Sequence, residues 1–153
     1  MNSLELKVPP PAIAVLVAVA MWGLSRITPS VQIPSGLRLF LALAVAAVAI
    51  GFSVAGVISF RSAKTTLDPT KPQLASSLVS SGIYAVTRNP MYVGLLLVLI
   101  ALAIFLSSPW ALAGPVAYFL YIGRFQIAPE ERALTALFGT EYTEYLSKVR
   151  RWL

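Results

Sequence analysis

Residues 37–60 read LRLFLALAVAAVAIGFSVAGVISF, and Arg38 is the only charged residue among them. A helix needs about 20 mostly apolar residues to cross the roughly 30 Å hydrocarbon core of a bilayer. This run is long enough to do so with some tilt. The sequence therefore predicts a transmembrane helix here.

The rest of the chain repeats this composition in separate blocks. Hydrophobic residues make up 58% of the chain and charged residues 12%, whereas soluble domains average about half and about a quarter. Further apolar blocks occupy residues 11–27, 90–107 and 109–127. We therefore expect an all-α integral membrane protein with about four transmembrane helices, folded as a single domain over residues 1–153.

Proline and glycine residues mark the ends of the predicted helices. Asn89-Pro90 and Ser108-Pro109 each combine a helix N-cap with proline at the first helical position. Residues 129–150 are amphipathic, with Gly139 in the middle. This pattern predicts two short helices that follow the last span.

Basic residues are distributed unequally about the four predicted spans. One side of the membrane holds Lys7, Arg61, Lys64, Lys71, Arg88, Arg124, Arg132, Lys148, Arg150 and Arg151, and the other side holds Arg26 and Arg38. The positive-inside rule then predicts that both termini and the central polar segment are cytoplasmic.

The composition also excludes several kinds of function. The chain has no Cys and no His, which removes thiolate and imidazole metal sites and Ser-His or Cys-His catalysis, and we expect no metal. The net charge of +6 is not carried by a basic run interleaved with aromatic residues, so nucleic-acid binding is not expected. Glu5 beside Lys7, and the poor cleavage site at Ser25-Arg26-Ile27, predict a retained first helix rather than a signal peptide.

Four charged residues near the ends of the blocks are candidates for chemistry. Arg88 and Arg124 suit an anionic group such as a carboxylate, although interfacial arginines also snorkel to the membrane surface. Glu130 and Glu131 suit the ammonium and hydroxyl groups of a cofactor. Acidic residues after Pro129 also favour the first turn of a helix without any ligand, so these residues alone leave both alternatives open.

Two longer stretches resemble a known family. The first reads LVSSGIY at residues 78–84 and RNPMYVG at residues 88–94, and it resembles the signature of the isoprenylcysteine carboxyl methyltransferase and phospholipid methyltransferase superfamily. The second resembles the C-terminal signature of that superfamily, and it reads EERAL at residues 130–134, FG at 138–139, then Tyr142, Tyr145 and VRR at 149–151. Together they cover roughly the second half of the chain in the family's order and spacing.

The resemblance implies a methyltransferase that uses S-adenosylmethionine and releases S-adenosylhomocysteine. It implies a cofactor pocket at the cytoplasmic ends of the last two spans, roofed by the C-terminal helices and open toward the bilayer, in a prokaryotic inner membrane. The implied cofactor contacts are Leu78, Val79, Tyr84, Asn89, Pro90, Met91, Tyr92, Glu130 and Glu131. The implied residues nearest the chemistry are Arg88, Arg124 and Gln126.

Two positions depart from the family pattern. Asn89 stands where the family usually has histidine, so no proton-transfer role carries over, although asparagine still caps a helix and forms hydrogen bonds. Gln126 stands where eukaryotic members tend to have a charged residue, so a prenylcysteine carboxylate does not carry over as the substrate.

The methyl acceptor remains open at this point. We expect a lipophilic or small apolar thiol, carboxylate or amine, and the lack of an obvious base favours an S- or O-acceptor over a protonated amine. The competing hypotheses are a non-enzymatic membrane subunit, a small transporter, and a methyltransferase relic inactivated by Asn89. A transporter is expected to carry ionisable residues or helix breaks at the block centres, and these centres are apolar.

Overall fold

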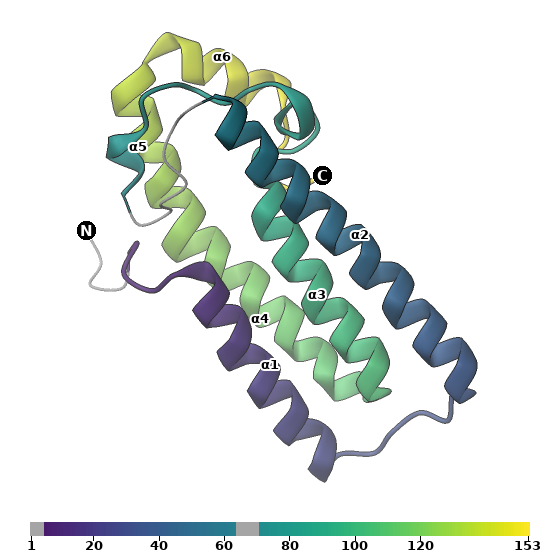
Figure 1. Cartoon of the computed structure of the whole chain (residues 1–153). Helices are drawn as coiled ribbons and strands as arrows, with labels where there is room; N and C mark the ends of the chain where they lie inside the picture. Colours follow the sequence, from purple (N-terminus) through teal and green to yellow (C-terminus); the bar gives the residue numbers. More distant parts are fainter. Residues whose placement is uncertain (1–4, 64–70) are drawn as a thin grey trace.

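The computed structural model describes residues 5–63 and 71–153, and within these residues it is helical, with no strand (Figure 1). The elements are, in order, α1 Pro10–Ile27, α2 Ser35–Ser62, η1 Pro72–Leu74, η2 Gly82–Ala85, α3 Pro90–Leu106, η3 Pro109–Leu112, α4 Ala113–Ile122, η4 Gly123–Ile127, α5 Ala128–Phe138 and α6 Thr140–Lys148. The predicted all-α fold is therefore confirmed over this part of the chain. Lys64, one of the basic residues predicted to be cytoplasmic, lies outside the described residues.

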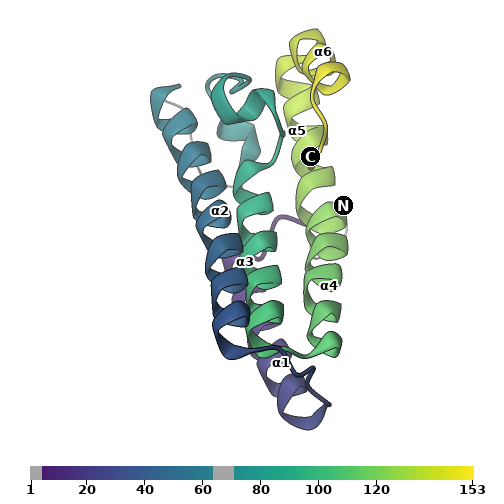
Figure 2. The same cartoon turned by 90° about the vertical axis from the view of Figure 1, so that its right-hand side faces the viewer.

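Helices α1 to α4 form one elongated bundle (Figures 1 and 2). Helix α2 lies along α3, and α1 packs across α3 and α4. Small residues bring α2 and α3 together, because a Cβ atom added to Gly94 would meet Ser53 and would lie 2.9 Å from the backbone oxygen of Ala49. Close approach through small residues is common between membrane helices.

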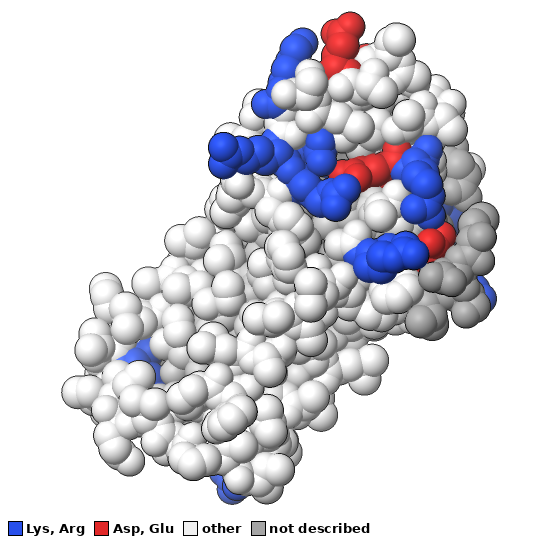
Figure 3. Space-filling view, turned by 180° about the vertical axis from the view of Figure 1, so that it is seen from behind, with Lys and Arg blue, Asp and Glu red and all other residues white. Residues whose placement is uncertain are grey.

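The bundle buries a narrow core and exposes a large apolar surface. Met21, Leu99, Tyr118 and Ile122 are each at most 2% exposed, whereas Phe40 on the outer face of α2 is 67% exposed. Figure 3 shows the long flank of the bundle almost free of charged side chains. Helices α1 and α2 are each long and apolar enough to cross a membrane. The exposed apolar surface supports association with a membrane.

The two ends of the bundle differ in chemistry. At one end the α1–α2 loop meets the α3–α4 turn, where the Val31 N–H donates to the Ser107 carbonyl at 2.7 Å and the hydroxyls of Thr28 and Ser108 lie 3.0 Å apart. The other end carries α5, α6 and the segment 71–89 (Figure 1). Most of the charged side chains in Figure 3 gather at this second end.

The sequence predicted that a new helix begins at Pro129, but in the structure the preceding helix continues through this residue. Helices α4, η4 and α5 follow one another without a break, although proline lacks the N–H that would continue the helix. Residues Gly123–Ile127 form a π-turn in which the Ala128 N–H donates to the Gly123 carbonyl. This wider turn accommodates the proline, and π-turns of this kind occur often at functional sites.

Candidate functional site

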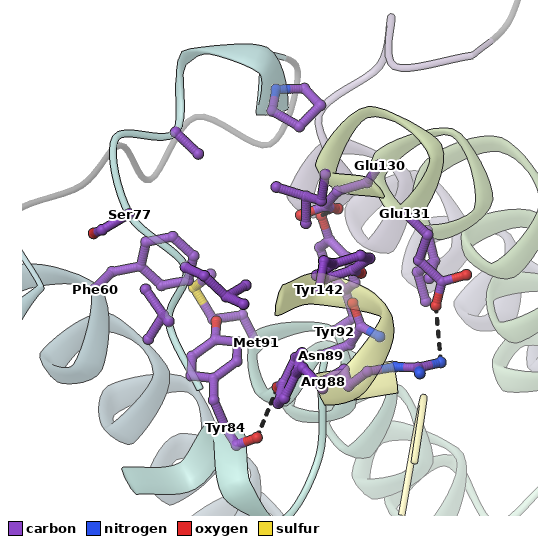
Figure 4. A pocket seen from close by; sticks show the side chains of 17 residues that line it. Phe60, Ser77, Tyr84, Arg88, Asn89, Met91, Tyr92, Glu130, Glu131 and Tyr142 are labelled. Carbon is purple, nitrogen blue, oxygen red and sulfur yellow. Dashed lines mark hydrogen bonds and ion pairs between the residues drawn. The ribbon is translucent and has the colours of Figure 1, made fainter. Parts of the chain in front are cut away.

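A pocket lies at the charged end of the bundle, where α2 ends and α3 begins (Figure 4). The apolar residues of its lining include Phe60, Leu78, Val79, Met91 and Leu134. The polar and aromatic residues of its lining include Arg88, Asn89, Tyr92, Glu130, Glu131, Tyr142 and Tyr145. The lining brings together segments that are far apart in the sequence.

The start of α3 shapes the floor of the pocket. Asn89 occupies the N-cap position and Pro90 the first helical position, as predicted. The Asn89 side chain does not cap the helix, because its amide donates instead to the Arg151 carbonyl at 2.8 Å. Gly56 of α2 lets this turn pack closely, since a Cβ atom there would lie 2.8 Å from Cγ of Met91.

A hydrogen bond between Tyr92 and Glu130 joins α3 to α5. The Tyr92 hydroxyl donates to Oε2 of Glu130 at 3.0 Å. Burial raises the pKa of Glu130 from 4.5 to about 7, while the hydrogen bond from Tyr92 acts in the opposite direction and the nearby Glu131 adds to the rise. Glu130 is therefore partly protonated near neutral pH.

A second polar link joins the start of α3 to α5 and to the C-terminal segment. Nη2 of Arg88 lies 2.9 Å from Glu131, and Nη1 donates to the Leu146 carbonyl at 3.1 Å. Arg151 also pairs with Glu131, through hydrogen bonds of 3.1 Å and 2.5 Å. The Arg88 and Glu131 side chains are only 12% and 16% exposed, so water screens this pair less than a surface pair.

Helix α6 covers the pocket with two tyrosines. The Tyr145 hydroxyl donates to the Tyr84 carbonyl at 2.7 Å, and the rings of Tyr142 and Tyr145 have their centroids 6.1 Å apart. Burial raises the pKa of Tyr145 to about 12 and also raises the pKa values of Tyr84 and Tyr142. All three phenols therefore stay protonated near neutral pH.

Most of the site residues predicted from the sequence meet in this pocket. Its lining includes Leu78, Val79, Tyr84, Arg88, Asn89, Met91, Tyr92, Glu130 and Glu131. Pro90, Arg124 and Gln126 lie outside this lining. Pro90 and Gln126 are buried, with Gln126 one turn before Glu130, and the more exposed Arg124 lies 3.5 Å from Glu5. The roles predicted for these three residues stay predictions.

Several lining residues of the pocket were not predicted from the sequence. Tyr142 and Tyr145 appeared in the C-terminal signature without a role. Their spacing of three on an amphipathic helix is a signal that could have placed both on its buried face. Phe60 had no signal, because it ends an apolar block like many others. Its ring packs edge-on against Tyr84, with centroids 5.3 Å apart.

An apolar helical bundle with a partly polar pocket at one end is suited to holding a small molecule at a membrane surface. Residues 37–141, well over half of the chain, match the family described as phospholipid methyltransferase. The protein therefore belongs to the phospholipid methyltransferase family. Membership of this family, together with the apolar helices, supports a methyltransferase associated with a membrane.

A protein of Haemophilus influenzae with the name "Uncharacterized protein" is 48% identical over 63 residues, which make up 41% of this chain and the whole of that relative. No solved structure matches the chain significantly.

Proposed function

We propose that the protein transfers a methyl group from S-adenosylmethionine to a lipophilic or small apolar acceptor, and that the cofactor binds in the pocket between α3, α5 and α6. The observation that carries this proposal is the composition of the pocket, whose lining combines apolar side chains with an arginine and paired carboxylates. A ligand with an apolar ring at one end and charged groups at the other suits such a site.

The chemistry of the polar groups fits this cofactor. Nε of Arg88 is buried and has no hydrogen-bond partner among the described residues. An unpartnered buried donor is uncommon, and it suits the carboxylate of the amino-acid end of the cofactor. Glu130 and Glu131 would accept hydrogen bonds from the ammonium group and the ribose hydroxyls.

The remaining lining groups suit the rest of the cofactor. Leu78, Val79 and Met91 offer an apolar surface for the adenine ring. The faces of Tyr84 and Tyr142 would attract a positively charged sulfonium.

The cofactor, when bound, supplies an activated methyl group, so the residues of the chain mainly bind and orient the reactants and exclude water. Thiolate and carboxylate acceptors need no base. Glu130, with its pKa raised to about 7, is also able to accept a proton from an amine. We therefore propose a thiol, carboxylate or amine acceptor.

We also propose that the bundle crosses a prokaryotic inner membrane four times, with the pocket and both termini in the cytoplasm. Helix α3 has 17 residues, at the lower limit of about 17 for a span. The α3–α4 turn contacts the α1–α2 loop at the far end of the bundle, which supports a crossing by α3 as well as by α2. Arg26, in the last turn of α1, and Arg38, near the start of α2, lie at that far end, while most of the basic side chains visible in Figure 3 gather at the opposite end of the bundle.

Calorimetric binding of S-adenosylhomocysteine to detergent-purified protein tests this proposal. We expect Glu130→Gln and Arg88→Gln to weaken binding by about tenfold or more, equivalent to about 1.4 kcal/mol. Glu144→Gln is the matched control, because it removes an exposed ion pair with Lys148 on α6. No binding by folded wild-type protein would leave a non-enzymatic membrane subunit, a small transporter or an inactive relic as the better hypothesis.

A further inference from the structure

The segment Glu5–Leu6 contacts the helix that carries Glu130. The Leu6 N–H donates to the Phe125 carbonyl at 3.1 Å. Phe125 lies inside the π-turn Gly123–Ile127, directly before the part of the helix that contains Pro129, which has no N–H of its own to donate. A backbone hydrogen bond therefore joins the π-turn to a residue more than a hundred positions away.

The conformation of Leu6 shows that this contact is specific. Its φ angle is 57°, in the left-handed region that favours glycine over leucine. A non-glycine residue holds such a conformation only where the surrounding contacts impose it. The hydrogen bond to Phe125 and the side chain of the neighbouring Glu5 supply these contacts.

Glu5 reinforces the backbone contact with two ion pairs. Its carboxylate lies 2.7 Å from Nη2 of Arg132 and 3.5 Å from Nη1 of Arg124. The Glu5 side chain is 5% exposed, whereas both arginine side chains are more than half exposed. Removing the charge from a buried ion-pair partner is costly. The two arginines therefore hold Glu5 on one side of the π-turn.

The same stretch of helix contributes to the pocket. Ile127, Glu130 and Glu131 follow Phe125 within two turns and line the cavity. Because close-packed protein interiors transmit strain, a change in the π-turn would change the position of Glu130 relative to Tyr92. Glu5 and Leu6 lie outside residues 37–141, which match the family.

We propose that Glu5 is a positioning residue that, together with the Leu6 N–H, clamps the π-turn and so places Glu130 for cofactor binding. This inference rests on the proposed function for its ligand. The contact of Glu5 and Leu6 with the π-turn can be measured without any ligand.

Two measurements on the full-length protein in detergent test the inference. The first is amide hydrogen exchange over residues 123–131 without ligand, and the second is the Kd for S-adenosylhomocysteine. Glu5→Gln keeps the size of the side chain but removes its charge, and we expect about fivefold faster exchange and about fivefold weaker binding, as for the loss of a partly buried ion pair. Glu144→Gln, which also removes a carboxylate charge, should leave both quantities within about twofold, because its ion pair is exposed.

The outcomes separate the clamp from the proposed function. If wild-type protein binds S-adenosylhomocysteine and Glu5→Gln changes neither quantity, or only one of them, the positioning role is wrong. If wild-type protein does not bind S-adenosylhomocysteine while exchange behaves as expected, the proposed function fails and the clamp stands without its cofactor role. Arg132→Gln is a second variant for the case that Glu5→Gln does not fold, and it should shift both quantities in the same direction by a smaller factor because Arg124 still pairs with Glu5.

Discussion

The Tyr92 hydroxyl donates a hydrogen bond of 3.0 Å to Glu130, so the first turn of α3 holds a carboxylate of α5. The two residues are 38 positions apart in the sequence and come from the two different stretches that resemble the family signatures. Both line the pocket. The contact therefore links those two stretches directly, as do the Arg88–Glu131 ion pair and the hydrogen bond from Tyr145 to Tyr84.

We predict that Tyr92 and Glu130 act on ligand binding as one unit. Tyr92→Phe removes only the donor and should weaken S-adenosylhomocysteine binding by about threefold, while Glu130→Gln should weaken it by about tenfold. The double variant should resemble Glu130→Gln, because contacting residues are not additive. Calorimetry on all four proteins gives the coupling energy. Effects that simply multiply would show that Tyr92 contributes separately from Glu130.

We predict that binding tightens as the pH rises through about 7. The pKa of Glu130 is raised to about 7, and cationic groups of the cofactor favour the ionised carboxylate, so affinity should rise by about tenfold between pH 6 and pH 8. Glu130→Gln should abolish this dependence. Tyr92→Phe should move the midpoint to higher pH, since the hydrogen bond from Tyr92 lowers the pKa of Glu130.

The stability of the ligand-free protein should change in the opposite direction. The folded-state pKa of Glu130 lies above the usual value of 4.5, so the folded state binds more protons than the unfolded state between these values. The contribution of Glu130 is therefore most favourable below pH 4.5 and is lost as the pH rises to about 7. Thermal unfolding of the wild type and Glu130→Gln over this range measures the difference. A pH dependence that is the same in both proteins would assign it to another group.

Local sequence signals predicted the helices better than the contacts between them. Asn89-Pro90 and Ser108-Pro109 mark the starts of α3 and η3 as expected, and Gly139 follows the end of α5 with a φ angle of 55°. These signals work because proline and glycine constrain the backbone at their own positions. The start of each helix is therefore readable without knowledge of its neighbours.

Contacts between distant segments were not predictable in the same way. The hydrogen bond of Asn89 goes to Arg151 rather than to its own helix, and Glu5 meets Arg124 and Arg132 across more than a hundred residues. Charged and polar residues of these kinds are common at any membrane boundary, so the identity of each residue does not indicate which distant residue it contacts. Most of the site residues implied by the family resemblance line the pocket, but the resemblance did not predict the contact of Glu5.

We predict that Gly94→Ala destabilises the fold. The added Cβ would meet Ser53 and the backbone of Ala49 on α2, and backbone atoms cannot yield without separating the helices. Overpacking of this kind costs about 1–3 kcal/mol. Gly51→Ala is the control, because a Cβ there meets no atom within 4 Å. Thermal unfolding in detergent should show a lower midpoint for Gly94→Ala only, and equal midpoints would mean that α2 and α3 are less closely packed.

We predict that α3 crosses the membrane, so that the α1–α2 loop and the α3–α4 turn face the side opposite α6. The chain contains no cysteine, so single cysteines introduced at the exposed positions Ser30, Trp110 and Ser147 report accessibility without background. An impermeant maleimide should label Ser30→Cys and Trp110→Cys in spheroplasts, and Ser147→Cys only in inside-out vesicles. The cysteine-free wild type is the control for labelling of other groups. Trp110→Cys is the deciding position, because a chain in which only α1 and α2 cross would place it on the same side as Ser147→Cys. That result would contradict four spans while leaving the two apolar helices α1 and α2 as the membrane anchor.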